Sequence, residues 1–433
     1  MPIFTAPDGT RLAYRLVGEG EPLICLPGGA LRASDHLGEL GGLGAHRQLV
    51  LLDPRGTGDP EVPADPATDR RGEQVADVEA LREHLGLDAV DVLAHSAGAG
   101  LALRHAAAHP RRVRGLALIA PRAQEAGVVA GAGDRPAAAG PDVPVLVLAG
   151  ELDEAPDPAT AARIAALFPR GETAVLPGAG HVPWLDDPGG FVRTVAAFLD
   201  PAVRNVRMPA GYRLACRTWG DPAAPPVLLL HGRTMTGADW TDVAEALAAT
   251  RRVYAPDLRG HGLSDRPGGY TYGELAEEVR TLLDVLGLDR VDLVGHSMGA
   301  AVAYQVAQTL PGRVGRMVLE DPLPPFPVDP PRPPEPRPAP EEIRALAFDW
   351  ELIPDTDEGA NHPDPAWAAD LARITAPTLV LSGGPESFLA EADVRRTAEL
   401  IPGARAVTIP VGHLIHRGDP EGFLAELKAF GIY

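Results

Sequence analysis

The feature of this 433-residue sequence that most constrains its fold is an internal duplication. The segment Pro-Asp-Gly-Thr-Arg-Leu-Ala-Tyr-Arg at residues 7–15 recurs as Pro-Ala-Gly-Tyr-Arg-Leu-Ala-Cys-Arg at residues 209–217. Three further pairs follow in the same order along the chain: 22–28 with 226–232, 53–58 with 257–262, and 94–98 with 295–299. Because the order of the motifs is kept and each copy has about 200 residues, we expect two similar domains, at 1–202 and 203–433.

The second copy carries an insertion between its last two motifs. The Gly-His pair at 180–181 corresponds to the pair at 412–413, an offset that adds about 30 residues to the second copy. Residues 322–340 contain eleven prolines in nineteen positions, a composition that predicts extended, polyproline-like backbone. Residues 341–350 are typical of a short helix. We therefore expect a short proline-rich lid at about 322–372 in domain 2. Domain 1, with an alanine- and glycine-rich segment at 122–142, is expected to be nearly lidless.

Short apolar runs alternate with helical patterns in both copies. Residues 90–94, 116–120 and 145–149 are typical of buried strands, and residues 73–85 and 191–199 have apolar positions at helical spacing. This alternation predicts an α/β class with a mostly parallel sheet flanked by helices in each domain. The segments around Gly9 and Gly211 indicate a hairpin at the start of each copy.

Composition excludes several function classes. The formal net charge is -20, so neither nucleic acid nor an anionic membrane is an expected partner. Lys428 is the only lysine, which leaves none in a suitable place for a phosphate-binding loop or a pyridoxal phosphate Schiff base. Cys25 and Cys216, one in each copy, are expected to be small core residues. The sequence shows no signal-peptide pattern and no apolar run long enough for a membrane span, so we expect a cytoplasmic protein.

Two serines carry the strongest chemical signal. Ser96 lies in Ala-His-Ser-Ala-Gly and Ser297 in Gly-His-Ser-Met-Gly, each after an apolar strand and before an apolar helix. Small residues two positions before and after a serine permit a tight strand-to-helix turn that exposes the hydroxyl. The helix start also supplies free N–H groups and a positive dipole end.

With these motifs in the same order twice, the chain resembles two α/β-hydrolase-fold enzymes fused head to tail. The resemblance covers all of the chain except the insertion, and it implies a triad in the chain order serine, acid, histidine. In copy one it implies Ser96, Asp153 and His181. In copy two it implies Ser297 and His413, with two alternatives for the acid: Glu386 has the spacing of Asp153, whereas Asp321 follows an earlier strand.

The same resemblance implies an oxyanion hole in each copy. One N–H donor is expected from the residue after the serine, which is Ala97 or Met298. The second is expected from the loop after the first parallel strand, at Gly29 or Arg233.

The expected function is a serine hydrolase that cleaves a small ester, thioester or amide, with no cofactor and no metal. Two alternatives remain: one domain is catalytic and the other a binding or scaffold domain, or the triads serve a lyase or transferase. The two domains are expected to pack on each other, and the oligomeric state is not predicted. His105 and His109 have the spacing of metal ligands but no third ligand nearby in the sequence, which favours an ordinary helix-surface pair. His416 is expected at the surface.

Overall fold

The computed structural model describes residues 1–29, 33–55, 57, 70–122 and 141–433. It divides into two compact units, Met1–Asp200 and Pro201–Tyr433, and each is described by itself. The boundary expected from the sequence, at residue 202, lies two residues further on. The segment expected to leave domain 1 lidless, 122–142, lies mostly outside the described residues.

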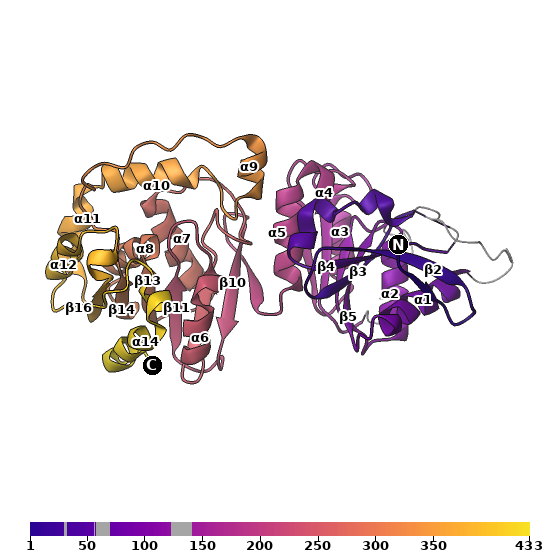
Figure 1. The fold of residues 1–433 in the computed structure, drawn as a ribbon, viewed down its shortest axis with the longest axis horizontal. Helices are drawn as coiled ribbons and strands as arrows, with labels where there is room; N and C mark the ends of the chain where they lie inside the picture. Colours follow the sequence, from indigo (N-terminus) through magenta and orange to yellow (C-terminus); the bar gives the residue numbers. More distant parts are fainter. Residues whose placement is uncertain (30–32, 56, 58–69, 123–140) are drawn as a thin grey trace. The chain divides into compact units, whose positions relative to one another are not determined.

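Each unit is built around one eight-stranded sheet (Figure 1). The strands of the first unit are β1 (Ile3–Thr5), β2 (Arg11–Val17), β3 (Pro22–Leu26), β4 (Gln48–Leu52), β5 (Val90–His95), β6 (Val113–Ile119), β7 (Val145–Gly150) and β8 (Gly171–Leu176). Those of the second are β9 (Val203–Arg207), β10 (Arg213–Trp219), β11 (Pro226–Leu230), β12 (Arg252–Pro256), β13 (Val291–His296), β14 (Val314–Glu320), β15 (Thr378–Ser382) and β16 (Arg405–Thr408).

The two sheets have the same topology. The first has the order β1-β2-β4-β3-β5-β6-β7-β8, and the second has the order β9-β10-β12-β11-β13-β14-β15-β16. In both, the first three strands of this order pair antiparallel and the other neighbours pair parallel. The hairpins turn at Gly9 and Gly211, whose φ angles of 90° and 94° suit glycine. The expected duplication of a mostly parallel α/β fold is confirmed.

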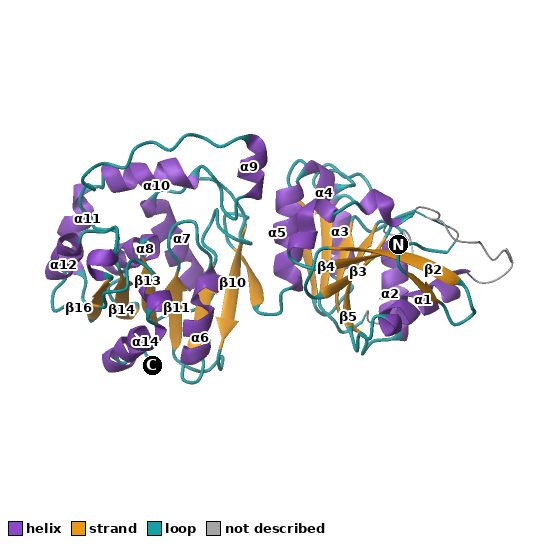
Figure 2. Cartoon of the chain, viewed as in Figure 1, coloured by secondary structure: helices purple, strands orange, loops and turns teal. Residues whose placement is uncertain are grey.

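Helices cover the sheets (Figure 2). In the first unit they are α1 (Arg70–His84), α2 (Gly98–Ala108), α3 (Pro158–Ala165), α4 (Pro183–Asp186) and α5 (Pro188–Leu199), with 3-10 turns η1 (Ser34–Leu37) and η2 (Leu40–Ala45). In the second they are α6 (Thr241–Leu247), α7 (Tyr272–Val285), α8 (Met298–Thr309), α9 (Pro340–Ala345), α10 (Leu352–Asn361), α11 (Pro365–Asp370), α12 (Glu391–Glu399), α13 (Ile415–Gly418) and α14 (Pro420–Phe430), with 3-10 turns η3 (Gly237–Trp240), η4 (Leu371–Arg373) and η5 (Gly384–Glu386). None of the helices in these described ranges is long and apolar enough to cross a membrane.

The alternation of side chains along β11 shows how the second sheet is buried on both faces. Leu228 and Leu230 belong to the core that the sheet forms with α7 and α8. Val227 and Leu229 belong to the opposite core, which includes residues of α6 and α14. Because a strand alternates its side chains between the two faces, a strand with apolar residues at every position needs helices on both sides.

The insertion of domain 2 contributes α9, α10 and α11, in orange in Figure 1. The first helix is shorter than the expected 341–350. Its C-terminal continuation is extended instead, since Phe348 forms a β-bridge with His261 and the Asp349 N–H donates to the Gly260 carbonyl at 2.6 Å. These bonds satisfy backbone groups that a longer helix would have used internally.

Alanine substitutions at two helix glycines test how tightly α8 packs on the sheet. A Cβ atom at Gly299, the second residue of α8, would lie 2.3 Å from the Leu230 carbonyl oxygen. We expect Gly299→Ala to lower the free energy of unfolding by about 1–3 kcal/mol, because α8 must move off β11. Urea denaturation followed by circular dichroism measures this change.

The matched control is Gly273→Ala, at the second residue of α7. A Cβ atom there would meet nothing within 4 Å. Alanine has the higher helix propensity, so this change is expected to raise the free energy of unfolding by up to about 1 kcal/mol. Equal effects of the two substitutions would contradict the packing argument.

Candidate active sites

Each candidate nucleophile occupies a sharp turn between a strand and a helix. Ser96 follows β5 and has a φ angle of 51°, and Ser297 follows β13 and has a φ angle of 52°. Non-glycine residues rarely adopt positive φ, and such strained positions are concentrated at functional sites. The turn requires small neighbours: a Cβ atom at Gly98 would lie 2.6 Å from the Pro27 carbonyl oxygen.

In domain 1 the three residues implied by the resemblance lie together as a hydrogen-bonded relay. His181 Nε2 is 3.0 Å from Ser96 Oγ, and His181 Nδ1 is 2.9 Å from Asp153 Oδ2. Asp153 is 7% exposed, and its other carboxylate oxygen accepts a hydrogen bond from the Ala155 N–H at 3.0 Å. This arrangement can accept the serine proton at Nε2 and hold the resulting imidazolium beside a carboxylate.

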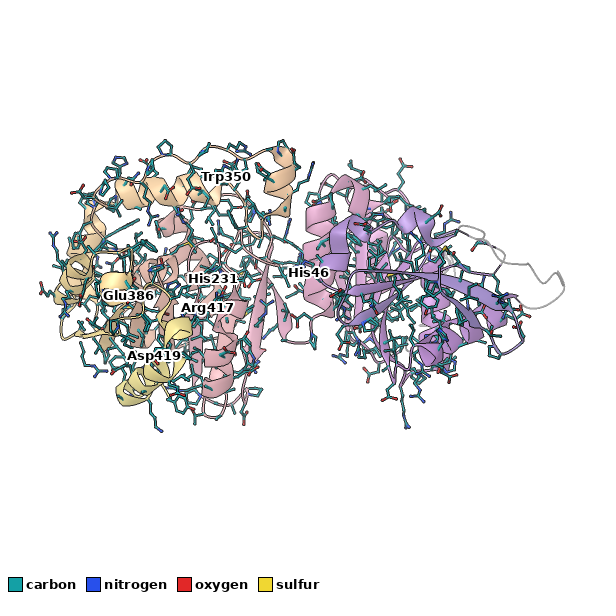
Figure 3. All side chains as sticks on the ribbon, viewed as in Figure 1. His46, His231, Trp350, Glu386, Arg417 and Asp419 are labelled. Atoms are coloured by element: carbon teal, nitrogen blue, oxygen red, sulfur yellow. The ribbon has the colours of Figure 1, made fainter. Side chains whose placement is uncertain are left out.

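In domain 2 the structure brings Asp321 to the histidine. His413 Nδ1 lies 2.7 Å from Asp321 Oδ2, and Asp321 is fully buried. Its carboxylate also accepts hydrogen bonds from the Gly383 N–H, at 3.0 Å, and from the Ser387 hydroxyl. Glu386, labelled in Figure 3, lies in the exposed loop after β15 and makes no hydrogen bond to His413 among the described residues.

The backbone at the end of the preceding strand is the same in both domains. Ala120 and Asp321 both have positive φ angles, 46° and 41°, and their N–H groups donate to Leu148 and Leu381 at 2.7 and 2.8 Å. The Cβ atom at this position therefore has an equivalent location in each domain. In domain 1 the side chain there is the methyl group of Ala120, and the carboxylate that contacts the histidine comes from Asp153, after the next strand.

The second triad lacks one of the hydrogen bonds of the first. No hydrogen bond joins Ser297 Oγ to His413 in the described part of the chain, whereas the corresponding bond in domain 1 is formed. Phe388 is 69% exposed, and its ring centroid lies 4.1 Å from that of His413. Catalytic hydrogen bonds often tighten only when substrate binds. A serine that is not hydrogen-bonded to its histidine in the free protein is therefore compatible with catalysis.

Two of the four backbone groups expected to form oxyanion holes are adjacent to the serines along the chain, and the other two follow loops that lie close to the serine turns. Ala97 is the N-cap of α2 and Met298 is the first residue of α8, positions whose N–H groups lack partners within the helix. Gly29 and Arg233 follow Gly28 and Gly232, which lie so close to the serine turns that a Cβ atom would be within 3 Å of His95 or His296.

Arg233 also connects the oxyanion loop of domain 2 to the insertion. Its Nη1 atom lies 2.6 Å from Asp357 on α10, and Arg332 binds the same carboxylate oxygen at 3.1 Å. Two guanidinium groups share one carboxylate, which leaves one excess positive charge there.

Two positioning residues were missed in the sequence. His95 and His296 precede the serines, and their Nε2–H groups donate to the backbone carbonyls of His181 and His413, each at 3.0 Å. Burial lowers the pKa of both imidazoles to about 4, so they are neutral donors at neutral pH. The signal that could have revealed them is histidine directly before the serine in both copies.

The expectation that His416 lies at the surface is wrong. His416 is 4% exposed because its ring packs on Trp240, with centroids 4.3 Å apart, and its Nδ1 atom lies 2.9 Å from the carboxylate of Glu320. Burial raises the pKa of Glu320, but the neighbouring His416 and His296 outweigh burial and hold that pKa below its usual value.

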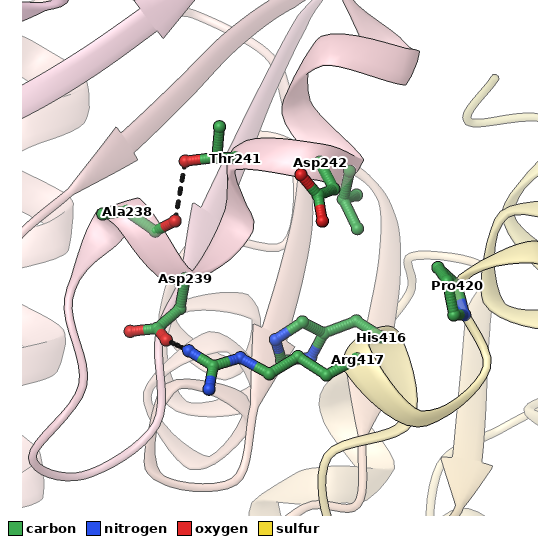
Figure 4. A pocket seen from close by; sticks show the side chains of 8 residues that line it. Ala238, Asp239, Thr241, Asp242, His416, Arg417 and Pro420 are labelled. Atoms are coloured by element: carbon green, nitrogen blue, oxygen red, sulfur yellow. Dashed lines mark hydrogen bonds and ion pairs between the residues drawn. The ribbon is translucent and has the colours of Figure 1, made fainter.

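A pocket of about 280 Å³ adjoins this buried pair (Figure 4). It is lined by Ala238, Asp239, Thr241, Asp242, Val243, His416, Arg417 and Pro420. An ion pair between Arg417 and Asp239 crosses it. Because neither Ser297 nor His413 lines this pocket, it is separate from the candidate active site.

Comparison with known proteins gives one family. The family model described as alpha/beta hydrolase fold matches residues 21–140 and 225–356. An uncharacterized protein of Mycobacterium tuberculosis is 42% identical over 129 residues, 30% of this chain and 36% of that protein. A 3-hydroxybutyrate-oligomer hydrolase of Cupriavidus necator is 38% identical over 118 residues, 26% of this chain and 40% of that protein. The chain thus spans well under half the length of these two curated relatives.

A longer match and a solved structure are each similar to about half of this chain. An sn-1-specific diacylglycerol lipase of the mouse is 26% identical over 266 residues, 52% of this chain and 85% of that protein. The crystal structure of a hydrolase from Pseudomonas aeruginosa is 28% identical, with a TM-score of 0.46, and covers 54% of this chain and 99% of that one.

Proposed function

This chain belongs to the α/β-hydrolase fold family, and from that premise we propose that it is a serine hydrolase acting on a small ester, thioester or amide. The proposed triads are Ser96–His181–Asp153 in domain 1 and Ser297–His413–Asp321 in domain 2. The observation that carries the proposal is the relay in domain 1, in which one imidazole lies 3.0 Å from the serine hydroxyl and 2.9 Å from a buried carboxylate.

The proposed reaction passes through an acyl-enzyme. Ser96 Oγ attacks the acyl carbon while its proton moves to His181 Nε2, and the carbonyl oxygen becomes an oxyanion facing the N–H groups of Ala97 and Gly29. The imidazolium then protonates the leaving alcohol, thiol or amine. Water, deprotonated by the same imidazole, hydrolyses the acyl-enzyme and returns the serine. Domain 2 would follow the same steps with Ser297, His413, Met298 and Arg233.

The experiment that tests this function is pre-steady-state hydrolysis of p-nitrophenyl acetate and p-nitrophenyl butyrate. An acyl-enzyme that forms faster than it hydrolyses releases a burst of p-nitrophenol before the steady state. We expect steady turnover, with a burst of up to two equivalents per chain. A wild-type protein that releases p-nitrophenol no faster than buffer would contradict the proposal for these esters.

A second candidate function rests on the difference between the two triads. Since Ser297 is not hydrogen-bonded to His413, domain 2 could bind an acyl compound without cleaving it while domain 1 carries the catalysis. In that case the burst is limited to one equivalent, while isothermal titration of the Ser96→Ala variant with a non-hydrolysable phosphonate analogue shows two equivalents bound, one in each domain.

A further inference from the structure

We propose that Glu79, His105 and His109 form a binding site for a divalent transition-metal ion, of which Zn²⁺ is the best match, in domain 1. The sequence provides the two histidines at metal-ligand spacing but no third ligand near them. The structure provides the third ligand from another helix: Glu79 lies on α1, whereas His105 is in the last turn of α2 and His109 is the residue that ends it.

The three side chains converge on one point. One ligand atom from each lies within 4.8 Å of the other two. His105 Nε2 is 3.1 Å from Glu79 Oε2, and the two imidazole centroids are 5.2 Å apart. Ligands of a tetrahedral zinc ion, with bonds of about 2.0–2.1 Å, lie roughly 3.4 Å apart. The most widely separated ligand atoms therefore need to approach each other by up to about 1.4 Å. His109 can move, because it is partly exposed at the end of its helix.

His105 also has coordination capacity that its hydrogen bonds do not use. Its ring is completely buried, and its Nδ1 atom has no hydrogen-bond partner among the described residues. Buried polar atoms usually have a partner, so this orphaned ring nitrogen indicates that His105 has a ligand which the described residues do not supply.

The donor set decides which ion fits. Two imidazoles and one carboxylate suit zinc and related transition metals, whereas calcium and magnesium prefer oxygen ligands throughout. Arg82 binds Glu79 with Nε at 3.0 Å and Nη2 at 2.6 Å, which orients the carboxylate as an outer-shell partner does in metal sites. Its positive charge also opposes the ion, so we expect weaker binding than at a structural zinc site with four protein ligands.

The proposed site is separate from the candidate active site in the same domain. His105 is nine residues after Ser96, and at a rise of about 1.5 Å per residue this places it about 13 Å away along α2. A metal ion there would link α1 to α2, so its expected effect is on the stability of domain 1 and not on the chemistry at Ser96.

The test is Zn²⁺ binding by the full chain after removal of metals with a chelator. Isothermal titration calorimetry is expected to show one equivalent per chain, and Co²⁺ in its place is expected to give the intense visible absorption of a tetrahedral ion. His109→Ala and Glu79→Gln should each weaken Zn²⁺ binding at least tenfold. Zn²⁺ should raise the melting temperature of the wild type but not that of His109→Ala.

The matched control is His362→Ala in domain 2. His362 and Glu358 form an exposed pair four residues apart, with Nδ1 and Oε1 at 3.1 Å, but they have no third ligand within reach among the described residues. This variant should bind Zn²⁺ like the wild type. The absence of Zn²⁺ binding, or binding that persists in His109→Ala and is lost in His181→Ala, would overturn the proposal. Ester hydrolysis by His109→Ala should equal that of the wild type, and this shows that its active site is intact.

Discussion

Replacing both Ser96 and Ser297 with alanine is expected to lower the turnover of p-nitrophenyl butyrate by roughly 10⁴- to 10⁶-fold. The reason is that the proposed mechanism has no other nucleophile in either domain: the acyl-enzyme cannot form, and His181 and His413 have no serine hydroxyl to deprotonate. The residual rate would come from the oxyanion donors and from binding alone. Initial rates of the wild type, the two single variants and the double variant measure the effect.

The single variants serve as controls for each other. If both domains are enzymes, each single variant keeps the part of the rate contributed by the other domain, and the two parts add up to the wild-type rate. If one single variant abolishes hydrolysis, the other domain is a binding domain or acts on a different substrate. A double variant that is folded by circular dichroism and hydrolyses the ester at the wild-type rate would refute the serine mechanism.

The second large effect is expected at Asp321. In the Ser96→Ala background, where only domain 2 can react, Asp321→Asn should lower turnover by about 10⁴-fold. The amide keeps the size of the side chain, but its NH₂ group cannot accept a hydrogen bond from the His413 Nδ1–H or stabilise the imidazolium. The His413 ring would then favour the wrong tautomer. Steady-state kinetics of the purified variant provide the measurement.

The matched control is Glu386→Gln in the same background. It makes the same chemical change in the other candidate acid, which lies in an exposed loop and does not hydrogen-bond to His413. Its turnover should stay within about twofold of the parent. A large loss with Glu386→Gln and a small one with Asp321→Asn would assign the acid to Glu386 and contradict the proposed triad.

The fold could be predicted from the sequence because its signals are local and occur twice. Apolar runs separated by helical patterns indicate a parallel sheet wherever they occur, and the turns at Gly9 and Gly211 require only one glycine each. The serine turns are equally local, since small residues such as Gly98 and Gly299 lie within two positions of each serine.

The choice of acid could not be predicted, because two carboxylates follow neighbouring parallel strands at the same edge of the sheet. Which of them reaches His413 depends on side-chain direction and burial. Asp321 is buried and accepts hydrogen bonds from Gly383 and Ser387, whereas Glu386 is exposed and its carboxylate has no such bond among the described residues. Spacing along the chain contains no information about that difference.

The same limit explains the errors at two histidines. His416 was expected at the surface because nothing nearby in the sequence pairs with it, but its partner Glu320 precedes it by almost a hundred residues. His105, expected in a helix-surface pair, is completely buried, and the Glu79 carboxylate that it contacts is likewise on another helix, 26 residues before His105. Contacts between elements that are distant in sequence produce no periodic pattern in the sequence from which they could be predicted.

Two serine nucleophiles in one chain are tested most directly by intact mass spectrometry after reaction with a fluorophosphonate. Such a reagent forms a stable bond with an activated serine and does not depend on knowing the substrate. We expect two equivalents per chain, located by peptide mapping at Ser96 and Ser297, with one equivalent lost in each alanine variant. Labelling at any other residue, or no labelling of the folded wild type, would contradict the account.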